Sequence, residues 1–285
     1  MSLVDQFESV FRSAERRRYA YERVNVRSCL VVTDLPAAGA ERYLAATRAF
    51  LVELGDDVAY RALTESDAQD VDALLRLVED AEPDLVVSYR NVRFGTWRWP
   101  YSLGVYLNVL TRETTTPVVV LPNPHEHPAL PFREAQTARV MVLTDHLTGD
   151  DRLVNYGARF TRPRGTLYLT HVEDDAVFAR YMEVIGKLPS IDTETAREDI
   201  RARLLKEPSD YVESCREVLE EQAHLTLSVE PVVRMGHTLA DYERLVREHD
   251  VDLLVFHTKD EDQLALHGKA YSLAVKLRET PILML

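Results

Sequence analysis

Two versions of one buried strand decide the fold of this chain, Asp84-Leu-Val-Val-Ser-Tyr89 and Asp252-Leu-Leu-Val-Phe-His257. Each is followed by a similar helical segment and by a short strand that starts with proline: Tyr101–Leu107 with Pro117–Leu121, and Tyr271–Leu277 with Pro281–Leu285. Each is preceded by a strand that ends in aspartate, Cys29–Asp34 or Val140–Asp145. A fixed order of matching parts indicates that one domain occurs twice. Each copy can therefore keep or lose a binding site separately.

Alternating strands and helices predict two doubly wound α/β domains with open parallel sheets, arranged as a pseudo-dimeric tandem repeat. The strands are continuous apolar runs, such as 251–256, which is typical of parallel strands covered on both faces. We expect strands over 28–34, 57–63, 84–88 and 117–121, with helices over 38–54, 67–81 and 100–111. In the second copy we expect strands over 140–145, 165–171, 226–233, 252–256 and 281–285, with helices over 150–160, 176–186, 193–206, 209–223, 238–249 and 268–278.

The two copies differ in length. The second has room for one more strand–helix unit and a helix pair, so the first is predicted to have only four strands. Four prolines between Leu121 and Pro131 predict a stiff, extended linker. The predicted division is an N-terminal helix in 1–25, a shortened first domain in 26–122, the linker in 123–137 and the second domain in 138–285.

An amphipathic helix is expected over residues 3–23. Its apolar residues recur at helical spacing, and Arg16, Arg17 and Arg18 follow them. We interpret this segment as a helix docked on the protein with a solvated basic face. A helix that binds a partner or a membrane surface is the alternative. The apolar positions are Leu3, Phe7, Val10, Phe11 and Ala14.

Composition narrows the function. The 285 residues carry a net charge of −13, which argues against general binding to nucleic acid or anionic membranes. No run of 18 apolar residues encodes a membrane span, and the N-terminus does not resemble a signal peptide. Cys29 and Cys215 form no disulfide framework, so we expect reduced thiols and a cytoplasmic protein.

The repeated order of these parts resembles the universal stress protein family, over residues 26–122 and 138–285. Thr170-His-Val-Glu173, after the second strand of the second copy, adds to the resemblance. It implies an adenine nucleotide alpha hydrolase-like fold and a cytoplasmic stress-response protein, often dimeric, with ATP bound by a subset of members. Family dimers pair their last strands antiparallel, which here predicts pairing of Val118–Leu121 with Ile282–Leu285.

ATP-binding members carry a loop with the pattern Gly, two residues, Gly, nine residues, Gly and Ser or Thr. Glycine allows backbone N–H groups to approach the phosphates. Both copies lack the glycines, and Asp260 places a carboxylate near the phosphate position. We therefore predict that neither copy binds ATP in the family manner and that no cofactor is present. The matching positions are Ser88, Asn91, Tyr101 and Ser102, then His257, Asp260, Ala270 and Tyr271.

Four residues remain candidates for a residual nucleotide site. Asp34 and Asp145 end the first strands, where ATP-binding relatives contact the adenosine moiety, and Ser102 and Ser272 lie at or beside the loop serine. The alternative, which we favour, is that each aspartate caps the following turn or helix.

Residues 89–101 replace the phosphate loop of the first copy and hold both Trp residues with Arg90, Arg93 and Arg98. Two interpretations remain open: an exposed surface for an anion, a base or a protein, or aromatic side chains that fill space inside the fold. The corresponding loop, 257–263, is acidic, and the two loops are predicted to attract each other.

Three histidine positions suggest chemistry that we do not favour. His125-Glu-His127 has two metal-binding side chains but no third ligand nearby in sequence, so we expect a solvated linker. His146 and His171 lie near the carboxyl edge of the sheet, where a His–Asp acid–base pair is imaginable. No nucleophile motif accompanies them, so no catalytic residue and no metal site is predicted.

The sequence favours a non-catalytic stress or regulatory protein that binds protein partners, with degenerate nucleotide sites and possible homo-oligomers. One alternative is a sensor that retains a nucleotide or another anion in at least one domain. Another is a cytosolic regulator of a membrane transporter, a role that requires association and no membrane segment of its own.

Overall fold

The computed structural model describes residues 18–93, 102–130, 132, 136–144, 147–188, 192–222, 224–258 and 268–285. Within these residues the strands are β1 (Ser28–Val32), β2 (Ala59–Leu63), β3 (Leu85–Tyr89), β4 (Val118–Leu121), β5 (Arg139–Thr144), β6 (Thr166–Asp174), β7 (Ser228–Gly236), β8 (Leu253–Phe256) and β9 (Ile282–Met284). The helices are α2 (Ala37–Phe50), the 3₁₀ helix η1 (Val52–Leu54), α3 (Val71–Ala81), α4 (Val105–Glu113), α5 (Asp151–Phe160), α6 (Asp175–Ile185), α7 (Thr193–Glu220), α8 (Thr238–Glu248) and α9 (Gly268–Lys276).

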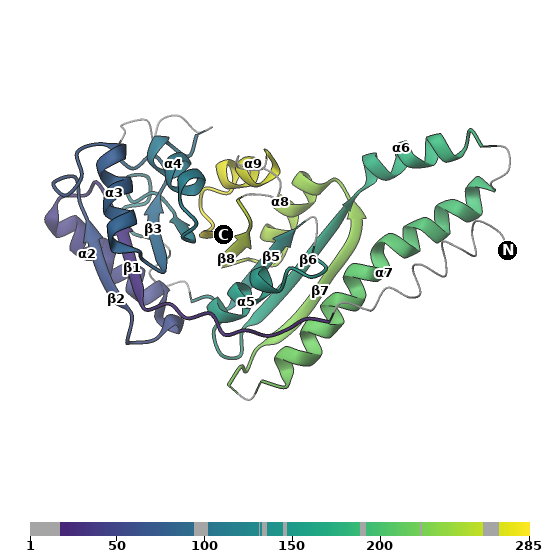
Figure 1. Cartoon of the computed structure of the whole chain (residues 1–285), viewed down its shortest axis with the longest axis horizontal. Helices are drawn as coiled ribbons and strands as arrows, with labels where there is room; N and C mark the ends of the chain where they lie inside the picture. Colours follow the sequence, from purple (N-terminus) through teal and green to yellow (C-terminus); the bar gives the residue numbers. More distant parts are fainter. Residues whose placement is uncertain are drawn as a thin grey trace.

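All described strands belong to one sheet, with the order β2-β1-β3-β4-β9-β8-β5-β6-β7. The neighbours are parallel except at the centre, where β4 and β9 pair antiparallel and Val119 lies opposite Leu283. The predicted pairing of Val118–Leu121 with Ile282–Leu285 is therefore confirmed, as is the α/β fold class. Because of this pairing, the two predicted sheets form a single one (Figure 1).

The two halves of the sheet repeat one arrangement. β1 lies between β2 and β3, and β5 lies between β6 and β8. The C-terminal half adds β7 outside β6, preceded by α6 and α7, which is the additional unit predicted from the length difference. Equivalent aspartates make equivalent contacts: Asp84 accepts from the Ser28 backbone N–H at 2.9 Å, and Asp252 from that of Arg139 at 2.9 Å. Each carboxylate thus accepts a hydrogen bond from the first residue of the neighbouring strand and stabilises the start of that strand.

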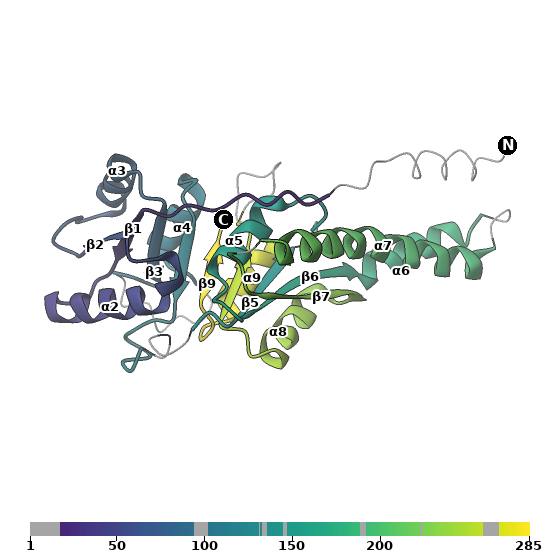
Figure 2. The ribbon, with the colours of Figure 1, turned by 90° about the horizontal axis from the view of Figure 1, so that it is seen from below.

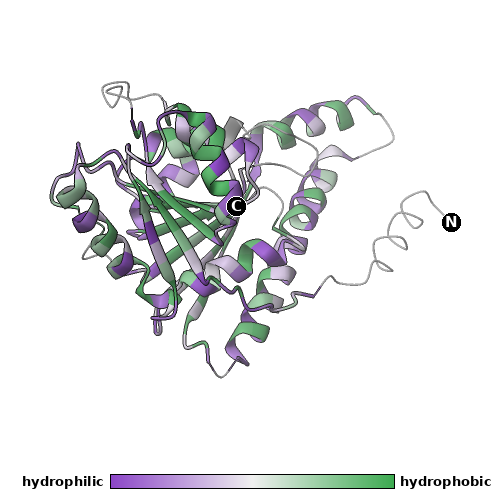
Figure 3. Ribbon diagram, turned by 60° about the vertical axis from the view of Figure 1, so that its left-hand side comes forward, coloured by the Kyte–Doolittle hydropathy of each residue, from purple (hydrophilic) through white to green (hydrophobic). Residues whose placement is uncertain are grey.

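Helices cover both faces of the sheet. Figure 2 shows α2 and α3 on opposite faces of the N-terminal half, and α7 and α8 on opposite faces of the C-terminal half. The strands are the most hydrophobic part of the molecule (Figure 3), and every residue of β3 and β4 is buried. Cys29 and Cys215 are buried free thiols. No described helix has both the length and the apolar character needed to cross a membrane.

Residues 18–27 belong to no helix or strand, so the described end of the predicted 3–23 helix is not helical; the rest of that prediction lies outside the described residues. This segment runs from α7 to β1. Arg159 of α5 donates to the carbonyl of Val24 at 3.2 Å and to that of Leu54 at 2.7 Å. Backbone contacts with its neighbours, together with the Tyr19 contacts to α5 and α7, hold this segment without a helix of its own.

The predicted break between helices 193–206 and 209–223 is wrong, because α7 continues through Pro208. A proline removes one backbone hydrogen bond, but Pro208 is buried and the residues around it remain helical. The other predicted elements are present with shifts at their ends. The largest are at α3 and α4, which start at Val71 and Val105, and the expected 38–54 helix is divided into α2 and η1. The boundaries at residues 25, 122 and 137 remain predictions.

Candidate functional site

The carboxyl ends of β1, β3 and β4 meet at one edge of the N-terminal half, since these strands are parallel neighbours. Asp34 follows β1, Arg90 follows β3 and His125 follows β4. This is where open α/β sheets bind ligands.

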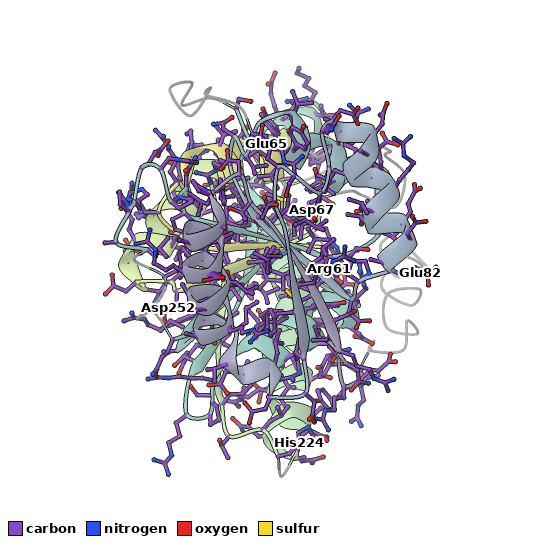
Figure 4. The ribbon with its side chains drawn as sticks, turned by 90° about the vertical axis from the view of Figure 1, so that its left-hand side faces the viewer. Arg61, Glu65, Asp67, Glu82, His224 and Asp252 are labelled. Carbon is purple, nitrogen blue, oxygen red and sulfur yellow. The ribbon has the colours of Figure 1, made fainter. Side chains whose placement is uncertain are left out.

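Figure 4 views this half end-on and shows Glu65 and Asp67, from the turn after β2, above Arg61. That turn is held closed because the Thr64 N–H donates to Asp67 Oδ2 at 2.7 Å.

The Asp34 carboxylate is the centre of a hydrogen-bond network at this edge. Oδ1 accepts from the Tyr89 hydroxyl and lies 2.8 Å from His125 Nε2. Oδ2 accepts from the Arg93 backbone N–H at 2.7 Å. The predicted capping role is wrong for Asp34: α2 starts after Pro36 without any side-chain cap, because the carboxylate is already bonded to groups from β3 and the segment after β4.

Burial alone raises the pKa of a carboxyl. At Asp34 the hydrogen bonds from Tyr89, His125 and the Arg93 N–H outweigh this effect and lower the pKa. Burial and the bonded Asp34 raise the pKa of Tyr89, so the phenol stays protonated and donates. Since Asp34 is an ionised acceptor with three partners, little of its capacity remains for a ligand.

Arg93 and Arg90 are not free to bind an anion. The Arg93 guanidinium donates to the carbonyls of Ala68 and Thr64, the latter at 2.6 Å, and lies over the Tyr106 ring. Arg90 is 7% exposed and donates to the carbonyls of Ala274 and Leu277 at the end of α9. The anion-surface interpretation is therefore wrong for these two arginines. Arg98 and the aromatic residues 94–101 lie outside the described residues, as does most of the acidic loop 257–263.

The expectation of an extended chain is wrong for the described part of the proline-rich segment, although His125, Pro128 and Ala129 are exposed. Residues 124–126 form a turn in which the Glu126 N–H donates to the Asn123 carbonyl at 3.1 Å. The Asn123 side chain donates to the Arg90 carbonyl at 2.8 Å, and Arg278 donates to Glu126. The segment thus contacts both halves. Among the described residues no group of three potential metal ligands occurs.

The other predicted site residues do not join this network. Ser102 accepts from the Gly104 N–H at 3.0 Å, which stabilises the turn before α4. Ser272 lies in helix α9 of the C-terminal half. Asp145 and His146 lie outside the described residues.

The carboxyl edge of the C-terminal half has a different set of polar groups. His171 Nε2 lies 3.2 Å from Glu173 Oε2, and His257 Nε2 lies 2.7 Å from Asp150 Oδ2. The His–Asp pair considered for His146 and His171 is not seen in the described residues, because His171 contacts a glutamate. His257, at a position that matches a family glycine, contacts Asp150 instead. Thr170 Oγ1 and His171 Nδ1 are buried without a hydrogen-bond partner among the described residues.

Replacing Asp34 by asparagine should destabilise the protein at neutral pH by about 1–3 kcal/mol, because charge-assisted hydrogen bonds are lost. The pKa of Asp34 is lowered in the folded state, so its contribution is fully present above about pH 4 and is lost as the pH falls through the folded value. Urea unfolding of Asp34→Asn and wild type between pH 7 and pH 3 should show a difference that narrows on acidification. Asp56→Asn, at an exposed position, is the control. A difference that does not vary with pH would contradict the assigned ionised network.

Scans against protein-family models and curated protein sequences found no match to this chain. Solved structures do match. A universal stress protein from Archaeoglobus fulgidus aligns over 92% of this chain and 98% of its own, with a TM-score of 0.52 and 11% identity. A protein of unknown function from Pseudomonas aeruginosa aligns over 91% and 92%, with a TM-score of 0.48 and 13% identity. The chain therefore has the fold of a universal stress protein, as the sequence resemblance predicted.

Proposed function

We propose that the chain is a tandem member of the universal stress protein family that acts in stress response or regulation by binding protein partners, without catalysis. In this proposal the two repeats form an internal pseudo-dimer through β4 and β9 in a cytoplasmic protein. One observation carries it: the strand-end carboxylate of the N-terminal half, Asp34, is bonded to Tyr89, Arg93 and His125 of its own chain. A nucleoside at this edge would have to displace three donors.

A nucleotide- or anion-binding sensor is the second candidate, and one observation favours it for the C-terminal half only. Thr170 Oγ1 and His171 Nδ1 are buried polar atoms without a described partner. Buried polar groups are normally hydrogen-bonded, so a ligand is one way to satisfy them. The missing glycines argue against triphosphate binding in either half.

Calorimetric titration with ATP, AMP and inorganic phosphate separates the two proposals. The leading proposal predicts a dissociation constant above about 1 mM for each of the three ligands. Asp34→Asn and Asp145→Asn form a matched pair, one change in each half. Low-micromolar binding that only Asp145→Asn weakens would replace the leading proposal by a sensor in the C-terminal half. Binding that Asp34→Asn weakens would overturn the interpretation of the N-terminal edge.

A further inference from the structure

A row of apolar side chains faces solvent along α6 and just beyond its end. These residues are 38–62% exposed, whereas Phe178 and Met182 on the neighbouring face of the same helix are buried. At 100° per residue the exposed row is centred about 100° from the buried one. The helix thus has a second apolar face, which Leu188 extends beyond the helix end. We call these residues the α6 stripe: Val177, Tyr181, Val184 and Leu188.

The α6 stripe lies on an arm of the molecule. α6 and the first part of α7 project beyond the sheet, as Figures 1 and 2 both show. All buried residues of α7 lie from Pro208 onward, so its first part packs on no layer of the fold except α6. A contiguous exposed apolar patch of this kind marks an interaction site more often than a bare surface.

A helix of this chain fits the stripe better than a second copy does. A stable interface buries about 800 Å² on each partner, which four side chains of one helix do not supply. A segment tethered to the same chain needs much less area, because its effective concentration is on the order of millimolar.

Residues 1–17, outside the described part, have the matching sequence pattern. Leu3, Phe7, Val10 and Ala14 are separated by four, three and four residues, and so are the members of the α6 stripe. Both rows are therefore about 16 Å long if helical.

The described chain begins beside this arm. The Tyr19 N–H donates to Ser214 Oγ of α7 at 2.9 Å, and its hydroxyl donates to Asn155 Oδ1 of α5 at 2.6 Å. The Tyr19 ring also packs edge-to-face against Tyr211 of α7. Any docking of residues 1–17 therefore starts from a fixed point on α7.

The distance along the arm is within reach. A Cβ at Gly186, after α6, would lie 3.5 Å from Thr193 Cγ2, near the start of α7. α6 and α7 run side by side from this point, so Val177, nine residues before Gly186, lies level with Ala202, nine residues after Thr193. Ala202 and Ser214 are about 18 Å apart along the axis of α7. The five residues from Ala14 to Tyr19 span about 17–18 Å when extended, and Arg18 and Tyr19 belong to no helix.

The direction of docking follows from this anchor. A segment docked from this anchor would place Ala14 nearest Val177 and Leu3 nearest Leu188, antiparallel to α6. This direction would bring Arg16–Arg18 toward Asp174 and Asp175 at the start of α6.

We propose that residues 1–17 cover the α6 stripe of their own chain with the face formed by Leu3, Phe7, Val10 and Ala14. The stripe is then an intramolecular docking site for an apolar helix. The inference is independent of nucleotide binding and of the proposed function.

Alkylation of a cysteine in the stripe tests this proposal. Val184→Cys introduces a thiol of similar size, and native Cys29 and Cys215, 2% and 0% exposed, give a slow background in the parent chain. The thiol should react about tenfold more slowly in the otherwise unchanged chain than in a chain that also carries Phe7→Asp and Val10→Asp. Glu183→Cys, on the other side of α6, should react equally in both backgrounds.

A dilution series identifies the occupant. Protection of the Val184→Cys thiol that is unchanged over a hundredfold dilution supports docking within one chain. Protection that disappears on dilution would overturn the proposal and assign the stripe to a second copy. Equal rates with and without the two aspartates would also overturn it. Far-ultraviolet circular dichroism of each variant verifies that the folded helices are retained.

Discussion

Replacing Leu283 by alanine is expected to lower the free energy of unfolding by about 2–5 kcal/mol, the range for buried leucines in cores. Leu283 is fully buried in β9, opposite Val119 of β4 on one side and Val255 of β8 on the other. Because β9 joins the halves of the sheet, the loss should reduce amide protection in both. Hydrogen exchange of β1 and β5 measures each half separately.

Val52→Ala is the control for this experiment, since Val52 is 53% exposed and lies away from the β4–β9 pair. It should leave protection in both strands unchanged. Loss of protection in β5 with wild-type protection in β1 would contradict the expectation, because it would mean that the halves unfold independently.

Replacing Arg90 by methionine is the second change with a large expected effect, about 3 kcal/mol of destabilisation. The guanidinium bonds the carbonyls of Ala274 and Leu277, the unpaired acceptors at the end of α9. Burial lowers the pKa of Arg90 to about 10, with Arg278 acting in the same direction, so the group remains charged at neutral pH. Methionine retains apolar volume but leaves the carbonyls without these charge-assisted bonds.

Arg90→Lys tests whether charge alone is sufficient. Lysine lacks the planar fork that reaches two carbonyls, so its stability should lie between those of wild type and Arg90→Met. Chemical denaturation with circular dichroism gives all three values. A lysine variant as stable as wild type would show that geometry is unimportant, and a methionine variant as stable as wild type would contradict the assigned bonds.

The repeated strands gave enough information to predict the sheet. A continuous apolar run such as Leu253–Phe256 is buried on both faces, and the family resemblance implied the antiparallel pairing of the two last strands. The site was harder to predict, because Asp34 and His125 are 91 residues apart in the chain. One signal was available: both follow strands that end at the same edge of the sheet.

Other features depend on packing that a local pattern does not contain. Pro208 predicts a helix end by its own chemistry, but α7 packs against β7, its buried residues begin at Pro208, and the helix stays continuous. Arg90 and Arg93 resemble solvent-facing cations in the sequence. In the fold both are bonded to backbone carbonyls, and no composition rule identifies those acceptors in advance.

Native mass spectrometry of the freshly purified protein tests most directly the central claim, that neither half of the sheet binds a nucleotide at its strand-end edge. We predict the bare mass of the 32.6 kDa chain, or multiples of it, with no change after addition of ATP or AMP. A nucleotide that survives purification, or a stoichiometric mass increase on addition, would contradict the claim and assign the protein to nucleotide sensing.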